Sequence, residues 1–451
     1  MSDHQRELKT CAILILFVSF STGEFISNIK DIIDTNTKQY KIVNSSNGLI
    51  RGQLKSTQFN NKPYYAFQGI PYAKPPIKDL RFKAPEPIIS WAPKIIDAFE
   101  YSNACMQPPI PILIYGMSEN CLFLNIFVPE NSTKIPVMFH IHGGAFVEGS
   151  GDDFLFGPDF IVEHNVILVT LNYRLGIFGF LSLNTPEISG NMGLKDQQLA
   201  LKWIHENIDN FGGDSNRITV SGHSAGAISA NLQALNDKSI GYFHKLITMS
   251  GVAIANIAFK VNHPFDQLFT LAKSQSSEQT FSMSDCNDLI EFLGSTTAES
   301  LVNLTTSIGW AATIEDSAAV RPFLTETPLQ KYKSFKCNNI TSLHGFNNAE
   351  SLFFMTDEQS RPEFIDNFLQ SFNKTFGSTF LFNVDPKSID NVAMSALLDD
   401  LQTFYFENAI DHNAKMAKYI ELMSDILLTH FIQQVIDIHA THSCNNSYAY
   451  E

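Results

Sequence analysis

The feature that most constrains the fold of this chain is the pentapeptide Gly-His-Ser-Ala-Gly at residues 222–226, taken with its flanks. A strand-like run, Ile218 to Val220, precedes it, and a helix-forming run, Ala227 to Leu235, follows it. A serine placed in this way sits on a sharp turn, where a side chain on either flanking glycine would collide with neighbouring chain. The pattern predicts that Ser224 is a nucleophile exposed at the carboxyl edge of a sheet; the alternative is a purely structural Ser/Gly turn.

Other segments predict strands and helices in alternation. Apolar runs at Ile135 to His142 and Val166 to Asn172 are typical of buried strands, and Leu194 to Phe211 has a helical pattern. Short buried strands that alternate with helices indicate an α/β fold with a mixed, mostly parallel central sheet flanked by helices. The half after about residue 250 is richer in helix patterns. Because no repeat and no Gly/Ser-rich linker divides the chain, we expect a single domain over residues 41–451.

Composition and charge exclude several classes of protein. The chain has 451 residues, of which 44% are hydrophobic and 17% are charged, so it can bury a large core and is not a disordered tail. Its formal net charge is −15, and no cluster of Lys and Arg of the kind that neutralises phosphates occurs along it. We therefore expect no nucleic-acid partner.

The N-terminus is typical of a secretory signal peptide. An apolar run, Cys11 to Phe20, follows Arg6 and Lys9 and ends in small residues, which predicts a signal over residues 1–23. The run is shorter than the roughly 20 apolar residues that a bilayer span needs. A buried helix is the alternative, and acidic residues near the start leave an uncleaved anchor open, so membrane association is expected only if this segment is retained.

Sequons and cysteines indicate that the mature chain is secreted, or lies in the lumen of the secretory pathway, as a glycoprotein. Asn-x-Ser/Thr sequons begin at Asn44, Asn131, Asn303, Asn339, Asn373 and Asn445. Once Cys11 leaves with the signal, the remaining cysteines are Cys105, Cys121, Cys286, Cys337 and Cys444. This odd number leaves one thiol without a partner in the chain. No Cys/His spacing suggests zinc.

A second motif supplies what an acyl-transfer nucleophile needs. A tetrahedral intermediate carries an oxyanion, and the turn after His142 exposes the backbone N–H groups of Gly143 and Gly144, to which Ala225 beside the nucleophile adds its own. The competing interpretation is a metal site, since His140 and His142 alternate on one strand and face the same side. No third ligand lies at a suitable spacing, so we predict an oxyanion hole, with no metal and no cofactor.

Several blocks in a fixed order resemble the type-B carboxylesterases, the cholinesterase-like branch of the α/β-hydrolases. The blocks are GIPYAKPP at 69–76, SENCLFLN at 118–125, HIHGGAF at 140–146, NYRLGIFGFLS at 172–182, GNMGLKDQQLALKWIHENIDNFGGD at 190–214 and GHSAGAIS at 222–229. The resemblance implies an α/β-hydrolase fold, hydrolysis of a small carboxylic ester by a Ser/Glu/His triad, and an acyl-enzyme intermediate. It also implies a disulfide between Cys105 and Cys121 and ion pairs joining Arg81 to Glu119 and Arg174 to Asp196.

The resemblance extends to the acid of the triad. The segment Gly345-Phe346-Asn347-Asn348-Ala349-Glu350 resembles the family's strand-end segment, although Ser351 stands where the family carries glycine. Glu350 is therefore expected to orient the imidazole of the base and stabilise its charged form. The alternative is a solvated loop glutamate.

The histidine of the triad is not found at its expected place. In the family it follows a late strand, and the chain stops at residues 447–451, which resemble the strand just before it. His430, His439 and His442 all precede that strand, so none fits the role, and His223 is expected to be a pocket residue. We therefore hypothesise that the chain is truncated at its C-terminus, with an incomplete sheet, and that it is a fragment or incomplete product of an active esterase.

The sequence also bears on the choice between an esterase and a binding protein, and on the class of substrate. The chain could be a non-hydrolytic, cholinesterase-like binding or adhesion ectodomain, but Ser224, the glycine turn and Glu350 favour an esterase. The loop between Cys105 and Cys121 contains no Trp to stack on a quaternary ammonium, which disfavours choline esters. Pocket walls could come from Phe353, Phe354 and Phe372, although aromatic residues at this density are more often core.

Overall fold

The computed structural model of the chain describes residues 39–109, 116–260, 265–275, 286–334, 340–356, 359, 362–372, 391–441 and 446–451. The expected signal peptide lies outside these residues. So do Cys337, Cys444, the sequon asparagines Asn339, Asn373 and Asn445, the side chain of Phe354, and His442. Among the helices that the structure describes, none is both long enough and apolar enough to cross a membrane.

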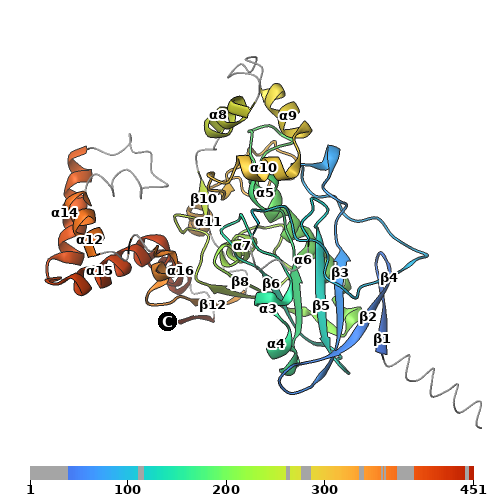
Figure 1. Ribbon diagram of the computed structural model, residues 1–451. Coiled ribbons are helices and arrows are strands. Elements are labelled where there is room, and N and C mark those ends of the chain that lie inside the picture. The colour runs from blue at the N-terminus through green and yellow to red at the C-terminus, as the bar shows by residue number, and fades with distance from the viewer. Residues whose placement is uncertain are drawn as a thin grey trace, which may run out of the picture.

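One large mixed sheet forms the centre of the molecule (Figure 1). Its described strands are β1 (Tyr40–Ser45), β2 (Gly48–Ser56), β3 (Pro63–Pro71), β4 (Ile95–Asp97), β5 (Phe123–Pro129), β6 (Ile135–Ile141), β7 (Ile167–Leu171), β8 (Gly213–His223), β9 (Lys245–Met249), β12 (Thr341–Gly345) and β13 (Ser447–Tyr450). Their spatial order is β1-β2-β3-β5-β7-β6-β8-β9-β12-β13, with β4 beside β2. A separate two-stranded sheet pairs β10 (Phe259–Lys260) with β11 (Ala312–Thr313).

Strand direction divides this sheet into two halves. Each pair in the order β1-β2-β3-β5-β7 is antiparallel. Strands β7, β6, β8, β9, β12 and β13 run parallel to one another, and β4 also pairs in parallel with β2. All five residues of β7 are buried, as expected for a central strand covered on both faces. The strand predictions at 135–142, 166–172 and 218–220 are confirmed, and β8 extends further on both sides.

Helices α6 and α7 fix the geometry behind the candidate nucleophile. Helix α6 (Met192–Phe211) buries one face against β8 and ends at Gly212, whose φ of +97° is the left-handed conformation common at helix C-termini. Helix α7 (Ala225–Ala234) begins directly after Ser224, packs against β8 and β9, and all of its residues are buried. Both helices confirm the sequence predictions.

The second half of the chain is helical, as predicted. Its helices are α8 (Phe265–Gln275), α9 (Cys286–Ser295), α10 (Ala298–Leu304), α11 (Pro328–Lys333), α12 (Pro362–Gln370), α14 (Asn391–Phe406), α15 (His412–Ser424) and α16 (His430–Thr441), with the short turns η2 (Glu350–Phe354) and η4 (Asp425–Thr429). The shorter helices α3 (Asp153–Phe156), α4 (Asp159–Glu163), α5 (Gly176–Phe180) and η1 (Lys78–Leu80) lie in the first half.

Helices α12, α14 and α15 form an arm beside the sheet (Figure 1). The arm has its own hydrophobic cluster, separate from the main core, and Phe372 is buried in it. Phe353, in contrast, is 89% exposed. Phe372 therefore belongs to the core of the arm, whereas Phe353 is largely exposed.

Strand β13 is the outermost described strand on its side of the sheet and pairs in parallel with β12. This confirms the strand expected at residues 447–451. The ring of Tyr450 lies directly over Gly345, where a β-carbon would come within 1.9 Å of the ring atom Cζ. Helix α16 packs against both strands.

Candidate active site

Ser224 occupies a strained turn between β8 and α7. Its backbone has φ of 55° and ψ of −124°, a conformation that residues with a β-carbon rarely adopt. Such strain costs on the order of 1–3 kcal/mol and persists only where the surroundings hold it in place. Here the Ser224 N–H donates to the carbonyl of Met249 at 2.8 Å, and its carbonyl accepts from Ile228 at 3.0 Å. The side chain is partly exposed at the carboxyl end of the parallel strands.

Glycines surround this turn because the chain approaches itself too closely for a side chain. A β-carbon on Gly222 would lie 2.2 Å from the carbonyl of Gly226, and one on Gly226 would lie 2.1 Å from the carbonyl oxygen of Ile141. A β-carbon on Gly251, after β9, would lie 2.6 Å from the carbonyl oxygen of Ser224. The strand-to-helix turn predicted from sequence is therefore locked between β6, β9 and its own helix.

The glycine turn after β6 lies against this serine. A β-carbon on Gly143 would lie 3.2 Å from Cβ of Ser224 and 2.6 Å from the carbonyl oxygen of His223. Gly144 has φ of +102°, and its carbonyl accepts from Val147 at 2.9 Å and Glu148 at 3.0 Å, which closes a tight turn.

Three backbone donors near the serine are available to a ligand. Within the described part of the chain, the N–H groups of Gly143, Gly144 and Ala225 donate to no protein acceptor. Ala225 is the first residue of α7, where the unpaired N–H groups and the helix dipole favour negative charge. These are the residues that the sequence predicted for an oxyanion hole; Gly143 lies against Ser224, and Ala225 follows that serine directly.

The two histidines of β6 and the following turn are buried and neutral. Burial lowers the pKa of His140 to about 3 and that of His142 to about 4. His140 Nδ1 lies 3.1 Å from Ser221 Oγ, and His142 stacks on Tyr173 with ring centroids 4.4 Å apart. Within the described residues no cluster of three or more metal-binding side chains includes them.

Glu350 begins η2, just beyond the carboxyl end of β12. Its carboxylate accepts from the backbone N–H of Asn347 at 2.8 Å and is partly exposed. His223 projects at the same sheet edge; desolvation lowers the pKa of its imidazole, and the Glu350 carboxylate opposes that shift. The fold therefore brings Glu350 to the edge where Ser224 lies, as expected from the resemblance.

The other histidines considered from sequence lie elsewhere. His430 is exposed at the start of α16. His439 is buried, and its Nδ1 lies 3.1 Å from Oγ of Ser342 on β12, away from the end of that strand where Glu350 follows. Among the described residues, no histidine hydrogen-bonds to Ser224 or Glu350.

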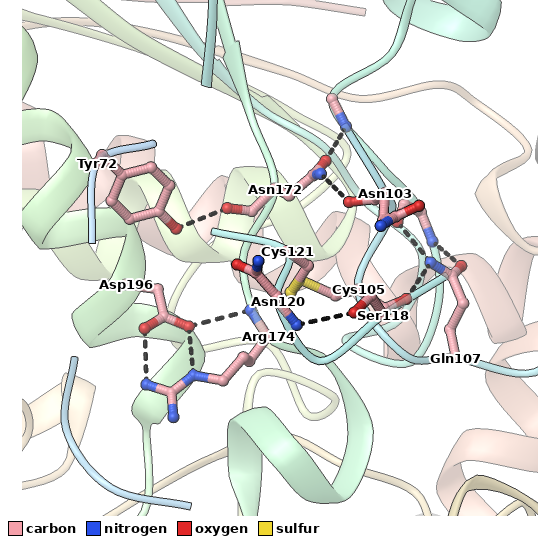
Figure 2. The surroundings of a disulfide bond; sticks show 12 residues. Tyr72, Asn103, Cys105, Gln107, Ser118, Asn120, Cys121, Asn172, Arg174 and Asp196 are labelled. Atoms are coloured by element: carbon pink, nitrogen blue, oxygen red, sulfur yellow. Dashed lines mark hydrogen bonds and ion pairs between the residues drawn. A yellow bond between two sulfur atoms is a disulfide. The ribbon is translucent and has the colours of Figure 1, made fainter. Parts of the chain in front are cut away.

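A disulfide and a buried ion pair lie close together beside the site (Figure 2). Cys105 and Cys121 form the expected disulfide, with Cα atoms 4.9 Å apart. Arg174 and Asp196 form a buried bidentate pair, with Nη2 to Oδ1 at 2.7 Å and Nε to Oδ2 at 2.8 Å. The pair expected between Arg81 and Glu119 is also present, at 2.7 Å from Nε to Oε2.

Sequence reasoning missed several buried polar residues. Glu315 is fully buried and accepts from Lys195 Nζ at 2.6 Å and from Asn191 Nδ2 at 2.7 Å. Tyr173 donates through Oη to the carbonyl of His142 at 3.0 Å, and Gln107 binds the backbone of Gly149. Tyr173, Asn191 and Lys195 stand in the blocks quoted above without a role given to them, whereas no spacing pattern marks Glu315 or Gln107.

Comparison with known proteins identifies similar chains. A sequence model described as "Carboxylesterase family" matches residues 39–451. A juvenile hormone esterase of Tribolium castaneum is 33% identical over 426 residues, which cover 89% of this chain and 70% of that protein. A carboxylic ester hydrolase of Bombus ignitus is 42% identical over 259 residues, which cover 55% of this chain but only 43% of that relative.

The fold is also shared with a solved structure. The crystal structure of juvenile hormone esterase from Manduca sexta, with OTFP covalently attached, matches with a TM-score of 0.76 and 29% identity. The match covers 91% of this chain and 77% of that chain. The α/β architecture predicted from sequence is confirmed.

Proposed function

This chain belongs to the carboxylesterase family, and from that premise we propose that it hydrolyses carboxylic esters through a covalent acyl-enzyme on Ser224. The family match and the relatives named as esterases support ester hydrolysis in general. The serine mechanism rests on the geometry around Ser224.

One observation carries this proposal. Three unpaired backbone N–H groups, those of Gly143, Gly144 and Ala225, belong to two turns that meet at the serine. An ester carbonyl attacked by Ser224 Oγ turns into an oxyanion, and donors fixed in advance stabilise that charge without reorganising.

The proposed reaction has two halves. In the first, Ser224 Oγ bonds to the carbonyl carbon, a base takes the hydroxyl proton, and the C–O bond to the alcohol breaks as the alcohol receives that proton. In the second, water attacks the acyl-serine, and the carboxylic acid leaves as Oγ regains a proton. Glu350 is proposed to orient the base, which is the role its family segment implies, although among the described residues no histidine hydrogen-bonds to it.

We propose an uncharged carboxylic ester as substrate rather than a choline ester. The described part of the disulfide loop, residues 105–109 and 116–121, presents no tryptophan to a quaternary ammonium, and neither does the remainder of its sequence. Glu119 on this loop is engaged with Arg81, which also donates to the carbonyl of Thr296 at 2.8 Å.

Covalent labelling tests the proposed nucleophile. We expect a fluorophosphonate probe to form an adduct on Ser224 of the purified chain, located by mass spectrometry of the tryptic peptide. Ser224→Ala should abolish the adduct. Ser250→Ala is the matched control, because Ser250 also has a positive φ, of 58°, and is buried near β9; it should label like the wild type. A natively folded wild type that gains no adduct would contradict the serine mechanism.

Glycosylation tests the proposed route through the secretory pathway. The sequon asparagines Asn44, Asn131 and Asn303 all have exposed side chains, so each can be reached by the transferase. We expect the chain secreted from insect cells to lose mass on treatment with a peptide N-glycosidase. Asn131→Gln should remove one glycan of that mass. A secreted product with the unmodified peptide mass would rule out the glycoprotein assignment.

A further inference from the structure

We propose that Gln107 is a positioning residue for the glycine turn at Ser224, an inference that rests on the proposed function. Gln107 lies two residues beyond Cys105 and is 2% exposed. Its Oε1 accepts from the N–H of Gly149 at 2.7 Å, and its Nε2 donates to the carbonyl of Gly149 at 2.9 Å. One buried carboxamide thus pairs with both backbone groups of a single residue (Figure 2).

Gly149 transmits this contact to the turn. It has φ of +115°, and a β-carbon there would lie 2.4 Å from His142 Nδ1 and 2.8 Å from the carbonyl oxygen of Gly143. That same carbonyl is held by His142 Nδ1 at 2.8 Å. The Gly149 backbone therefore packs directly on Gly143, where a β-carbon would lie 3.2 Å from Cβ of Ser224, and a shift of Gly149 would move Gly143 with it.

Gln107 is itself attached to the disulfide loop. Gln107 Nε2 also donates to the carbonyl of Cys105 at 3.0 Å, and Cys105 is fixed to Cys121 by the disulfide. A second buried carboxamide repeats the arrangement, since Asn172 accepts from the N–H of Gly151 at 2.8 Å and donates to the carbonyl of Asn103 at 3.0 Å. The disulfide loop and the segment that follows the glycine turn are therefore tied together by two buried carboxamide side chains.

A small displacement of an oxyanion donor is costly in rate. Removal of one such donor typically lowers kcat by about 10²–10³-fold, and a misplacement of about 1 Å can cost about 10²-fold. Gln107→Met keeps the length and volume of the side chain but can neither accept nor donate strongly. We expect it to lower the second-order rate of fluorophosphonate labelling at Ser224 by at least tenfold, and to accelerate hydrogen exchange of the Gly149 amide.

Gln107→Glu offers a readout that a merely structural role would not move. Its carboxylate can accept from the Gly149 N–H but cannot donate to the Gly149 carbonyl, whereas the protonated acid can do both. Burial raises the pKa of a carboxyl, so this proton is gained at mildly acidic pH. We expect the ratio of labelling rates, Gln107→Glu over wild type measured at the same pH, to rise as the pH falls from 8 to 5.5.

The control is Gln68→Met. Gln68 is equally buried, at 2% exposed, but its Oε1 accepts from Lys55 Nζ at 2.5 Å rather than from the turn. It should label within twofold of the wild type. Equal labelling by wild type and Gln107→Met, or a pH-independent ratio for Gln107→Glu, would overturn the positioning role alone. A wild type that takes no label would overturn the serine mechanism, and the positioning role with it.

Discussion

Replacing Arg174 by methionine is expected to destabilise the chain by about 3–5 kcal/mol, because it leaves a buried carboxylate without its partner. The side chains of Arg174 and Asp196 are 3% and 0% exposed. Arg174 also donates to the carbonyl of Lys83 at 2.7 Å, so the change breaks a contact to a third segment. The loss should be measured as a shift of the urea unfolding midpoint, followed by circular dichroism.

The loss of stability caused by Arg174→Met is expected to depend on pH. Burial raises the pKa of Asp196, and Arg174 opposes that rise. Without Arg174 the folded-state pKa rises further above the unfolded value, so the folded variant gains a proton that the unfolded chain lacks. That stabilising contribution is present at low pH and is lost as the pH rises through the folded-state pKa. The penalty of Arg174→Met should therefore be smaller at pH 5 than at pH 8.

Arg51 provides the matched control for this ion pair. It pairs with Asp97 in the same bidentate geometry, at 2.6 and 2.8 Å, but the two side chains are 39% and 45% exposed. Solvent screens such a pair, so Arg51→Met should shift the midpoint much less than Arg174→Met. Equal shifts for the two variants would show that burial of the Arg174 pair does not govern its contribution.

Replacing Gly226 by alanine is expected to disrupt the turn at Ser224. The new β-carbon would lie 2.1 Å from the carbonyl oxygen of Ile141 and 2.7 Å from that of His142, and both are backbone atoms that cannot rotate away. Overpacking of this kind costs about 3 kcal/mol. Relief of the clash must separate α7 from the end of β6, which moves Ala225 away from Gly143. We therefore expect at least ~100-fold slower fluorophosphonate labelling in any folded material.

Gly294→Ala is the control for this substitution. Gly294 lies in α9, and a β-carbon there meets no atom within 4 Å. Alanine is also the better helix former by about 1 kcal/mol, so this variant should be at least as stable as the wild type and should label normally. If Gly226→Ala is labelled at the wild-type rate, the tight packing inferred at the turn between β8 and α7 is refuted.

Local pattern was sufficient for the elements around Ser224. The mostly apolar run of β7, the amphipathic helix α6 and the Gly-x-Ser-x-Gly turn each follow from neighbours in the sequence, and the structure confirms all three. The resemblance to the family added the disulfide and the Arg174 to Asp196 pair, which spacing alone did not determine. Glu350 likewise came from the resemblance, and its role as the triad acid stays a proposal.

Tertiary packing decided which distant polar residues pair and which phenylalanines are buried. Gln107 and Gly149 are 42 residues apart, and Lys195 and Glu315 are 120 apart, so no periodic pattern links the members of either contact. A buried polar group needs a hydrogen-bond partner, but the amino-acid sequence does not say which residue that partner is, because many arrangements satisfy the same donors and acceptors. The outward position of Phe353 and the buried position of Phe372 are equally invisible in sequence, since both are phenylalanines in helical segments.

The sequence by itself determined the strand, turn and helix that carry Ser224, because a sharp turn with no room for a β-carbon admits few residue types. It also predicted which backbone donors would serve that serine, since the glycines of both motifs are required by local geometry, and this assignment stays a prediction. Only the tertiary structure decided how these turns are held against each other. That depends on buried carboxamides, a disulfide and ion pairs from distant segments, whose pairing energies arise only once the sheet has brought them within hydrogen-bonding distance.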